Sequence, residues 1–377
     1  MTSARSARSA RTARLDRVRA AMADLRIDAL LLSLGADLPW LTGYTAMPLE
    51  RLTMLVLPAD AEAVLVVAEL EAPRVVEDPE TFTVRPWQET EDPVEIVAEL
   101  VGARASLAIS DRAWATFLLQ LQARLPGAKW LPASVVTGPL RARKDPDEVA
   151  ALAAASAAAD RVAWQLVNGE IPLIGRTEAD VSEDIGRRLL AEGHQLVNFA
   201  IVGSGPNSAS PHHDAGPRRI GPGEAVVCDF GGTMNGYCSD ITRTVWTGSA
   251  SPPSEFRNLY AVLQEAQAAA VDAAVVGTPC EDVDGVARRT ITEGGYGSYF
   301  IHRTGHGIGL EEHEDPYIVA GNCEPLTPGH AFSIEPGIYV AGRFGARIED
   351  IVVARNQDDG GPRSLNAVDH ELALVDA

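Results

Sequence analysis

The sequence predicts an α/β (α+β) protein with two domains, a smaller N-terminal α/β domain and a larger C-terminal domain that contains an internal repeat. Segments that favour helix and strand alternate as far as about residue 140, which is the pattern of an α/β domain. Beyond that point the order helix, helix, strand, hairpin occurs twice, between about residues 145 and 247 and between about residues 254 and 354. This duplication predicts a pseudo-twofold repeat in which the two hairpins face one cavity.

Composition supports two globular domains and excludes some partners. The chain has 377 residues, 46% hydrophobic and 22% charged, which is ordinary globular usage and enough for two cores. A net charge of -20 argues against nucleic acid or an anionic membrane as a partner, because phosphate binding needs a basic surface. No apolar run reaches the roughly 18 residues of a membrane-spanning helix. The 4 cysteines lack metal-site spacing and are too sparse for a disulfide framework, so we expect a cytoplasmic protein.

The N-terminal domain is expected over residues 15–140. A helix is predicted over residues 14–25, and apolar strand-like segments follow at residues 29–33, 53–57 and 64–67. Residues 1–14 are rich in Arg and Ser and contain no acid. Low-complexity chain ends of this kind are usually unstructured, so this segment is predicted to be a disordered leader.

The C-terminal domain is expected over residues 141–377 and opens with a helix-start signal. Asp145 can cap the helix, Pro146 fits its first turn and Glu148 completes a capping box, and the helix should end near residues 168–169. Three further helices are predicted, one after Thr177 that stops before Gly193, one from Ser254 to about Val276, and one that ends at residues 294–295.

Two predicted hairpins carry four carboxylates. Strands at residues 225–230 and 237–245, centred on the turn-rich residues 231–236, would pair Asp229 with Cys238. Asp240, two residues on, then lies on the same face as a diagonal neighbour of Asp229. The same construction at residues 331–340 and 346–353 would pair Glu335 with Ile351 and leave Glu349 diagonal to Glu335. Each hairpin is therefore expected to present two acids on one face.

The acids and one histidine predict a metal site. Carboxylates in apolar strands are costly unless their charge is compensated, and like charges that share a site raise at least one pKa. Two divalent cations between the hairpins would compensate them. His306 has glycines on both sides, so the backbone can turn sharply and present the imidazole to the same place. A donor set of imidazole and carboxylates suits Mn²⁺, Co²⁺, Fe²⁺ or Zn²⁺ better than Ca²⁺.

The ordered motifs DFGG, SDITRT, HRTGHGIGLEEHE, SIEPGIY and RIEDIVV resemble those of the M24 metallopeptidases, in the branch that contains Xaa-Pro dipeptidase (prolidase) and Xaa-Pro aminopeptidase. The segment GADLPWLTGY resembles the creatinase-type N-terminal domain, so the resemblance covers nearly the whole chain. It implies a pita-bread catalytic domain, two divalent metal ions with manganese as the first candidate and cobalt, zinc or iron as alternatives, and a homodimer.

The resemblance also implies roles for individual residues. Asp240 and Glu349 would bridge the two metals, Asp229 would complete one ligand shell, and His306 and Glu335 would complete the other. Glu335 is also the candidate for handling a proton at the attacking water. His212 and His313 match positions that bind substrate and stabilise the tetrahedral intermediate, and His302 matches a substrate-pocket histidine. Arg347, on the acidic side of its strand, is expected to support the carboxylates.

The expected activity is hydrolysis of the Xaa-Pro bond in small proline-containing peptides, as a dipeptidase. The alternatives are an Xaa-Pro aminopeptidase that acts on longer peptides, a creatinase-like hydrolase that works without these ligands, and a non-catalytic module that binds peptides or proteins. An Xaa-Pro amide lacks an N–H and has a restricted ring, so a dedicated pocket is expected. The aromatic candidates for its wall are Phe300, Tyr317, Tyr339 and Phe344, whereas His213 is predicted to be a surface loop residue.

Overall fold

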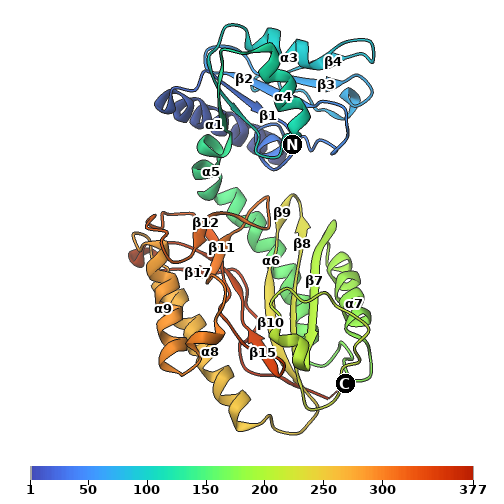
Figure 1. Cartoon of the computed structure of the whole chain (residues 1–377), viewed down its shortest axis with the longest axis vertical. Helices are drawn as coiled ribbons and strands as arrows, with labels where there is room; N and C mark the ends of the chain where they lie inside the picture. Colours follow the sequence, from blue (N-terminus) through green and yellow to red (C-terminus); the bar gives the residue numbers. More distant parts are fainter. Residues whose placement is uncertain (1, 377) are drawn as a thin grey trace. The chain divides into compact units, whose positions relative to one another are not determined.

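The computed structural model describes residues 2–376 of the chain, with side chains from residue 10 onward. It divides into two compact units, one that ends at Arg141 and one that begins at Ala142 (Figure 1).

The N-terminal unit is built on a mixed sheet of order β4-β3-β2-β1-β5-β6. The strands are β1 (Ala29–Leu32), β2 (Met54–Pro58), β3 (Val64–Ala68), β4 (Thr83–Trp87), β5 (Ser106–Ile109) and β6 (Lys129–Pro132). The helices are α1 (Thr2–Leu25), α2 (Asp37–Thr42), α3 (Pro93–Val101), α4 (Ala115–Arg124) and α5 (Ser134–Ala142). All four residues of β1 are buried. A continuous apolar run in a central strand is expected where both faces of a sheet are covered.

Helix α1 includes residues 2–14, for which the sequence analysis predicts disorder. The structure therefore differs from that expectation. Ala and Arg alternate with Ser through this segment, and Ala and Arg are among the strongest helix formers. The composition of this segment is therefore compatible with an extension of the first helix.

The C-terminal unit repeats one order of elements. The first half contains α6 (Pro146–Val167), α7 (Glu178–Ala191), β7 (Leu196–Ser204), β8 (Ala225–Met234), β9 (Tyr237–Cys238) and β10 (Ile241–Thr247). The second half contains α8 (Ser254–Ala273), α9 (Cys280–Glu293), β11 (Gly305–Gly307), β12 (Glu314–Ile318), β13 (Ala331–Ile334), β14 (Gly337–Val340), β15 (Phe344–Arg347) and β16 (Asp350–Val353). The strand neighbours β7, β8 and β10 in one sheet correspond to β11, β13 and β16 in the other, which confirms the predicted repeat.

Helices α6 and α7 begin at the residues predicted from their capping signals. Asp145 and Glu148 form the capping box of α6, and Thr177 forms a second one with Asp180 at the start of α7. Helices α6 and α7 cover the sheet of the first half, and α8 and α9 lie side by side against that of the second half (Figure 1). Their apolar faces pack on buried strand residues such as Phe230 and Phe332. The strand faces turned away from the helices are left to form a cavity.

The first hairpin has a different register from the predicted one. Asn235 and Gly236 have φ angles of 51° and 84°, so the turn has only two residues, and Met234 pairs with Tyr237. Two-residue turns with two positive φ angles favour the sequence Asn-Gly. Asp229 therefore pairs with Thr242 instead of Cys238. The shift is an even number of residues, so Asp229 and Asp240 still share a face.

The second hairpin is also shifted. Ser333 pairs with Ile351 and Gly337 with Arg347, so Glu335 and Glu349 stand opposite each other at the break between the two ladders instead of diagonally. The backbone of Glu349 bridges to Thr242 of the first hairpin, and its N–H donates to Thr242 O at 3.2 Å. This bridge joins the two hairpins and brings their acidic faces together.

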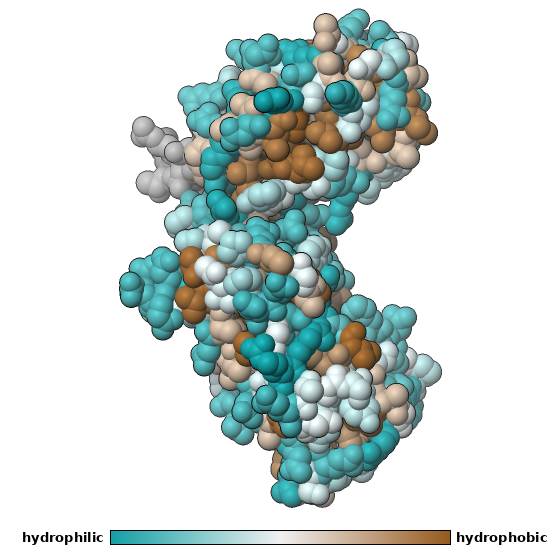
Figure 2. Space-filling model, turned by 60° about the vertical axis from the view of Figure 1, so that its left-hand side comes forward, coloured by the Kyte–Doolittle hydropathy of each residue, from teal (hydrophilic) through white to brown (hydrophobic). Residues whose placement is uncertain are grey.

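Hydrophilic residues predominate on the face drawn in Figure 2, with hydrophobic residues gathered over part of it. This agrees with the high net charge of the chain. Among the described residues, no helix combines the length and the apolar character needed to cross a membrane.

Candidate metal centre

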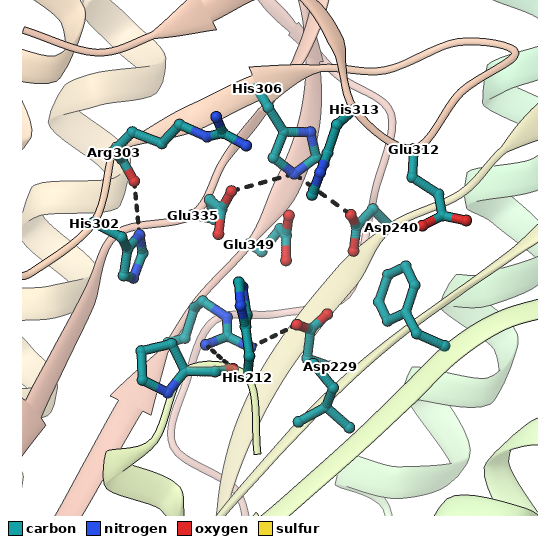
Figure 3. Close-up of a pocket in the computed structure, with 14 residues that line it drawn as sticks. His212, Asp229, Asp240, His302, Arg303, His306, Glu312, His313, Glu335 and Glu349 are labelled. Carbon is teal, nitrogen blue, oxygen red and sulfur yellow. Dashed lines mark hydrogen bonds and ion pairs between the residues drawn. The ribbon is translucent and has the colours of Figure 1, made fainter. Parts of the chain in front are cut away.

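A cavity of about 470 Å³ lies in the C-terminal unit, on the side of the strands that the helices leave free. Its wall includes all the predicted metal ligands, substrate histidines and the supporting arginine, namely His212, Asp229, Asp240, His302, His306, His313, Glu335, Arg347 and Glu349. Figure 3 shows the carboxylates and His306 converging from different strands toward a common space.

Three side chains form the tightest group. One ligand atom each from Asp240, His306 and Glu349 lies within 4.8 Å of the others, and all three residues are buried. His306 Nε2 lies 3.8 Å from Asp240 Oδ2 and 3.3 Å from Glu335 Oε1. Bonds from a metal ion to nitrogen or oxygen ligands are about 2 Å long, so two ligands of one ion lie roughly 3 to 4 Å apart. The distances between these donor atoms are in that range and would allow one ion to contact them together.

The glycines beside His306 allow its close approach to the neighbouring strands. A Cβ atom at Gly305 would lie 1.8 Å from Ser333 O, and one at Gly307 would lie 2.2 Å from Asp315 O. Both contacts are with backbone, so no rotation of a side chain could relieve them. The backbone N–H of His306 donates to Ser333 Oγ at 3.0 Å, and this hydroxyl donates to Glu335 Oε1 at 3.2 Å. Local packing therefore determines where the side chains of His306 and Glu335 point.

Burial and crowding make the carboxylate group unfavourable without a cation. Burial, together with the charges of Glu349, Asp229 and Glu335, raises the pKa of Asp240 well above its ordinary value. Burial and neighbouring acids raise the pKa of Glu349 in the same way, and burial raises the pKa of Glu335 to about 7 against the lowering effect of Arg347. Burial lowers the pKa of His306 to about 3, so its imidazole is neutral and available as a ligand at pH 7.

Two carboxylate oxygens provide a further test of fit to a metal. Asp229 Oδ1 and Asp240 Oδ1 are buried and have no hydrogen-bond partner among the residues that the structure describes. A buried acceptor without a donor is costly and is rare in native proteins. Both atoms belong to the predicted ligand set, and a cation would satisfy them. The residues present therefore fit a divalent metal.

Arg347 connects the carboxylates to the cavity wall. It is 2% exposed, and its guanidinium donates to Asp229 Oδ2 at 2.5 Å, to Tyr339 OH at 2.8 Å and to Thr242 Oγ1 at 3.1 Å. Thr242 Oγ1 in turn donates to Glu349 Oε2 at 2.7 Å. Thr242 therefore orients a carboxylate and an arginine at once, a role that the sequence analysis did not foresee.

The three predicted substrate histidines lie around this group. The ring centroids of His306 and His313 are 4.0 Å apart, and burial followed by the charge of Arg303 lowers the pKa of His313. His302 Nε2 lies 2.9 Å from Tyr339 OH, and burial lowers the pKa of His302 to about 4. His212 lies on the opposite wall, beside Asp229 in Figure 3.

Comparison with known proteins identifies the family. The signature of metallopeptidase family M24 matches residues 149–356, and that of the creatinase/prolidase N-terminal domain matches residues 14–143. The chain belongs to metallopeptidase family M24. It is therefore a hydrolase, and the pita-bread fold and creatinase-type N-terminal domain expected from its motifs are confirmed.

Relatives of this M24 chain match it over nearly their whole length. The probable dipeptidase PepE of Mycobacterium tuberculosis is 45% identical over 361 residues, 94% of this chain and 94% of that protein. The Xaa-Pro dipeptidase of Lactobacillus helveticus is 34% identical over 375 residues, 96% of this chain and 98% of that protein. The crystal structure of dipeptidase PepE from Mycobacterium ulcerans has a TM-score of 0.89 at 43% identity and covers 98% of this chain and 99% of that one.

Five residues that line the cavity have no role predicted from the sequence. They are Phe199, Ile201, Pro211, Arg303 and Glu312. Arg303 and Glu312 lie inside the motif HRTGHGIGLEEHE, and their charge close to His306 in the sequence is a signal that could have indicated them. Phe199, Ile201 and Pro211 come from an ordinary strand and a loop, so their presence in the wall depends on tertiary packing.

Other expectations for this region need correction. The hydrophobic wall contributed by Phe199, Ile201 and Pro211 replaces the four aromatic candidates. Phe300 and Phe344 belong to the hydrophobic core under α8, Tyr317 lies beneath Arg303, and Tyr339 supports Arg347. His213 lies in a loop as predicted, but it is half-buried, with Nε2 at 2.8 Å from Glu178 Oε2, and is therefore less exposed than expected.

Proposed function

We propose that this M24 metallopeptidase is an Xaa-Pro dipeptidase (prolidase) that uses two divalent metal ions to hydrolyse small proline-containing peptides. The observation that carries the proposal is the group of buried carboxylates and His306 in the wall of a cavity of about 470 Å³. Within the described part of the chain, one buried oxygen each of Asp229 and Asp240 has no hydrogen-bond partner. The names of the relatives in Lactobacillus helveticus and Mycobacterium tuberculosis support a dipeptidase.

The five ligands divide naturally between two ions. Asp240 and Glu349 belong to the tight group and would bridge them, Asp229 would complete one shell, and His306 and Glu335 would complete the other. Manganese is the first candidate, with cobalt, zinc and iron as alternatives, because all accept imidazole and carboxylate together. When bound, the ions supply Lewis acidity to the scissile carbonyl and to the attacking water.

The surrounding residues would bind the substrate and move protons. Glu335, with Oε1 3.3 Å from His306 Nε2, would take up and release the proton of the attacking water. His313 has a lowered pKa, so at pH 7 it is neutral and can donate an N–H to the peptide carbonyl or to the developing oxyanion. The single ring proton of neutral His302 goes from Nδ1 to Arg303 O at 2.7 Å, so His302 would contact the substrate as part of the pocket wall. His212 would contact the substrate from the opposite wall, and Arg347 would hold Asp229 in place.

We further propose that the enzyme is a cytoplasmic homodimer. Cys228, Cys238 and Cys280 are buried free thiols and Cys323 is an exposed one, a state that suits a reducing compartment. Twofold dimers are the commonest soluble oligomers.

The first test is hydrolysis of Ala-Pro beside Ala-Pro-Ala by the Mn²⁺-loaded enzyme, with a chelator-treated control. Cleavage of the dipeptide in preference to the tripeptide, abolished by the chelator, is the expected result. Preference for the tripeptide would identify an Xaa-Pro aminopeptidase. Absence of chelator-sensitive cleavage of either peptide would contradict a peptidase of this class and favour the non-catalytic binding module.

A further inference from the structure

The imidazole of His212 lines the cavity but is not held by contacts of its own. Among the residues that the structure describes, none forms a hydrogen bond or an ion pair with it. His302, by contrast, is held through both ring nitrogens, since Nδ1 donates to Arg303 O at 2.7 Å and Nε2 lies 2.9 Å from Tyr339 OH. The position of His212 on the wall therefore depends on the backbone of its own loop.

This loop follows β7 and begins with the short helix η2 (Gly205–Ala209). It runs from Ser204, the last residue of β7, to His213, and it contributes Pro211 and His212 to the cavity wall. Figure 3 shows His212 on the side of the cavity opposite His306. A loop outside the strand ladders has few backbone hydrogen bonds of its own, so contacts with neighbouring elements determine how well it is fixed.

One buried carboxylate binds the beginning, the middle and the end of the loop. Glu178 Oε1 accepts hydrogen bonds from the N–H and the hydroxyl of Ser204, at 2.8 and 2.7 Å. Asn207 Nδ2 donates to both oxygens of Glu178, at 3.1 and 3.0 Å, and His213 Nε2 donates to Oε2 at 2.8 Å. Because Glu178 is the first residue of α7, these bonds attach the loop to a helix that packs on the sheet.

The carboxylate of Glu178 stays ionised although its side chain is fully buried. Burial raises its pKa, but the hydrogen bonds donated by Ser204, His213 and Asn207 together outweigh this effect and hold the pKa below its ordinary value. Hydrogen bonds to an ionised acceptor are roughly twice as strong as those between neutral groups. Loss of this one charge would therefore weaken every bond between the loop and α7.

Other contacts of the loop do not replace these bonds. The carbonyl oxygen of Pro211 accepts from Arg347 at a longer distance, 3.3 Å, and the hydroxyl of Ser208 accepts from Gly345 N at 2.8 Å. Neither reaches the C-terminal side of His212. On that side the neighbouring residue is His213, which is bound to the buried carboxylate.

We propose that Glu178 is the positioning residue of His212, which it holds at the substrate through Ser204, Asn207 and His213. This inference rests on the proposed function and deepens it, because it adds a residue that does not line the cavity to the apparatus of the same reaction. Displacement of a catalytic group by about 1 Å can lower a rate by about 100-fold. Loss of the bonds to the loop should therefore reduce turnover without any change at the metal ligands.

The test is a double-mutant cycle between E178Q and H212A. It measures kcat/KM for Ala-Pro with Mn²⁺-loaded enzymes of known metal content. Glutamine keeps the shape of Glu178 and removes its charge, so E178Q should lower kcat/KM by about 10- to 100-fold and leave the metal content unchanged. In the H212A background E178Q should have less than about a threefold effect, because the group through which Glu178 acts is gone. In an H302A background E178Q should keep its full effect, since His302 has its own partners.

Two further variants separate positioning from folding. Asp184 lies on the same helix and accepts from Arg176 and Arg188 at 2.9 and 3.1 Å, so D184N removes a carboxylate that does not contact the loop. D184N should leave kcat/KM unchanged. H213A removes only one of the bonds to Glu178 and should lower kcat/KM by about 3- to 10-fold, with little further loss when it is combined with E178Q.

Amide hydrogen exchange provides a readout besides turnover. Exchange over residues 205–213, followed by mass spectrometry, should be faster in E178Q than in the wild type and unchanged in D184N. If E178Q fails to fold, H213A takes its place in the cycle with H212A and in the exchange experiment.

The outcomes distinguish this inference from the function on which it rests. Equal loss of kcat/KM by E178Q in the wild-type, H212A and H302A backgrounds, or no loss in any of them, would overturn the inference, while cleavage of Ala-Pro by the wild type would still uphold the dipeptidase. Unchanged hydrogen exchange in E178Q would also overturn it. If the wild type cleaves no Xaa-Pro peptide in a chelator-sensitive way, the proposed function is wrong and the role of Glu178 in it is wrong as well.

Discussion

Replacement of Thr242 by valine tests how strongly the hairpin contacts control the metal centre. The hydroxyl of Thr242 donates to Glu349 Oε2 at 2.7 Å and accepts from Arg347 Nε at 3.1 Å, and the residue is fully buried. Valine has nearly the same shape, so the change removes two hydrogen bonds to charged groups without opening a cavity. At about 1.5–3 kcal/mol each, the two bonds set an upper bound of about 3–6 kcal/mol on the loss of unfolding free energy.

Metal affinity should fall as well, because Glu349 loses the donor that orients it. Loss of such an outer contact typically weakens metal binding by about 10–100-fold. The assay is calorimetric titration of Mn²⁺ into chelator-stripped wild-type and T242V protein, with urea unfolding of the same metal-free samples.

Thr244 provides a matched control two residues along the same strand face. Its hydroxyl donates to Arg347 O at 2.9 Å and accepts from Arg347 N at 3.1 Å, so T244V also removes two buried hydrogen bonds but touches no carboxylate. At about 0.5–1.5 kcal/mol for each neutral bond, T244V should lose about 1–3 kcal/mol of stability. It should retain wild-type Mn²⁺ affinity. Equal weakening of metal binding by both variants, or none by T242V, would refute the argument that Thr242 acts through Glu349.

Three further predictions concern other parts of the site and fold. Asp240→Asn should abolish turnover and weaken binding of both metal ions, and near-normal turnover with full metal content by plasma mass spectrometry would rule out the bridging role. His313→Ala should keep its metal and lower kcat, because the imidazole is proposed to contact substrate instead of metal, so loss of metal would show that the assignment is wrong. Burial, with the charges of Lys144 and Arg143, lowers the pKa of His330 to about 4. In the unfolded chain the pKa of a histidine is about 6.5, so between about pH 6.5 and pH 4 this side chain is protonated in the unfolded state but not in the folded state. Protonation therefore favours the unfolded state, and the free energy of unfolding falls over this range as the pH is lowered. His330→Gln should reduce the difference in unfolding free energy between pH 7 and pH 4.5 by about 2–3 kcal/mol in urea titrations, and an unchanged difference would contradict the assignment.

Helix starts and strand faces could be read from local sequence, whereas register could not. The capping box of Asp145 and Glu148 depends on four consecutive residues, so the start of α6 was correctly predicted. The face shared by Asp229 and Asp240 depends only on the alternation of side chains, which an even shift preserves. The pairing partners of the two aspartates depend on where the turn lies. The segment 231–236 contains several glycines, and the sequence analysis centres the hairpin on the whole segment, whereas the structure has a two-residue turn at Asn235-Gly236.

The sequence by itself determined the family, the repeat and the identity of the charged and imidazole groups, because ordered motifs and periodicity are local properties of the chain. Only the tertiary structure decided what each group contacts. Asp229 lies against Arg347, and Glu349 is held by Thr242 across 107 residues of sequence. Arg303 and Glu312 stand apart on the cavity wall. Such contacts depend on two hairpins that meet through a backbone bridge and on helices that leave one face of the strands free. No short window of sequence contains that information.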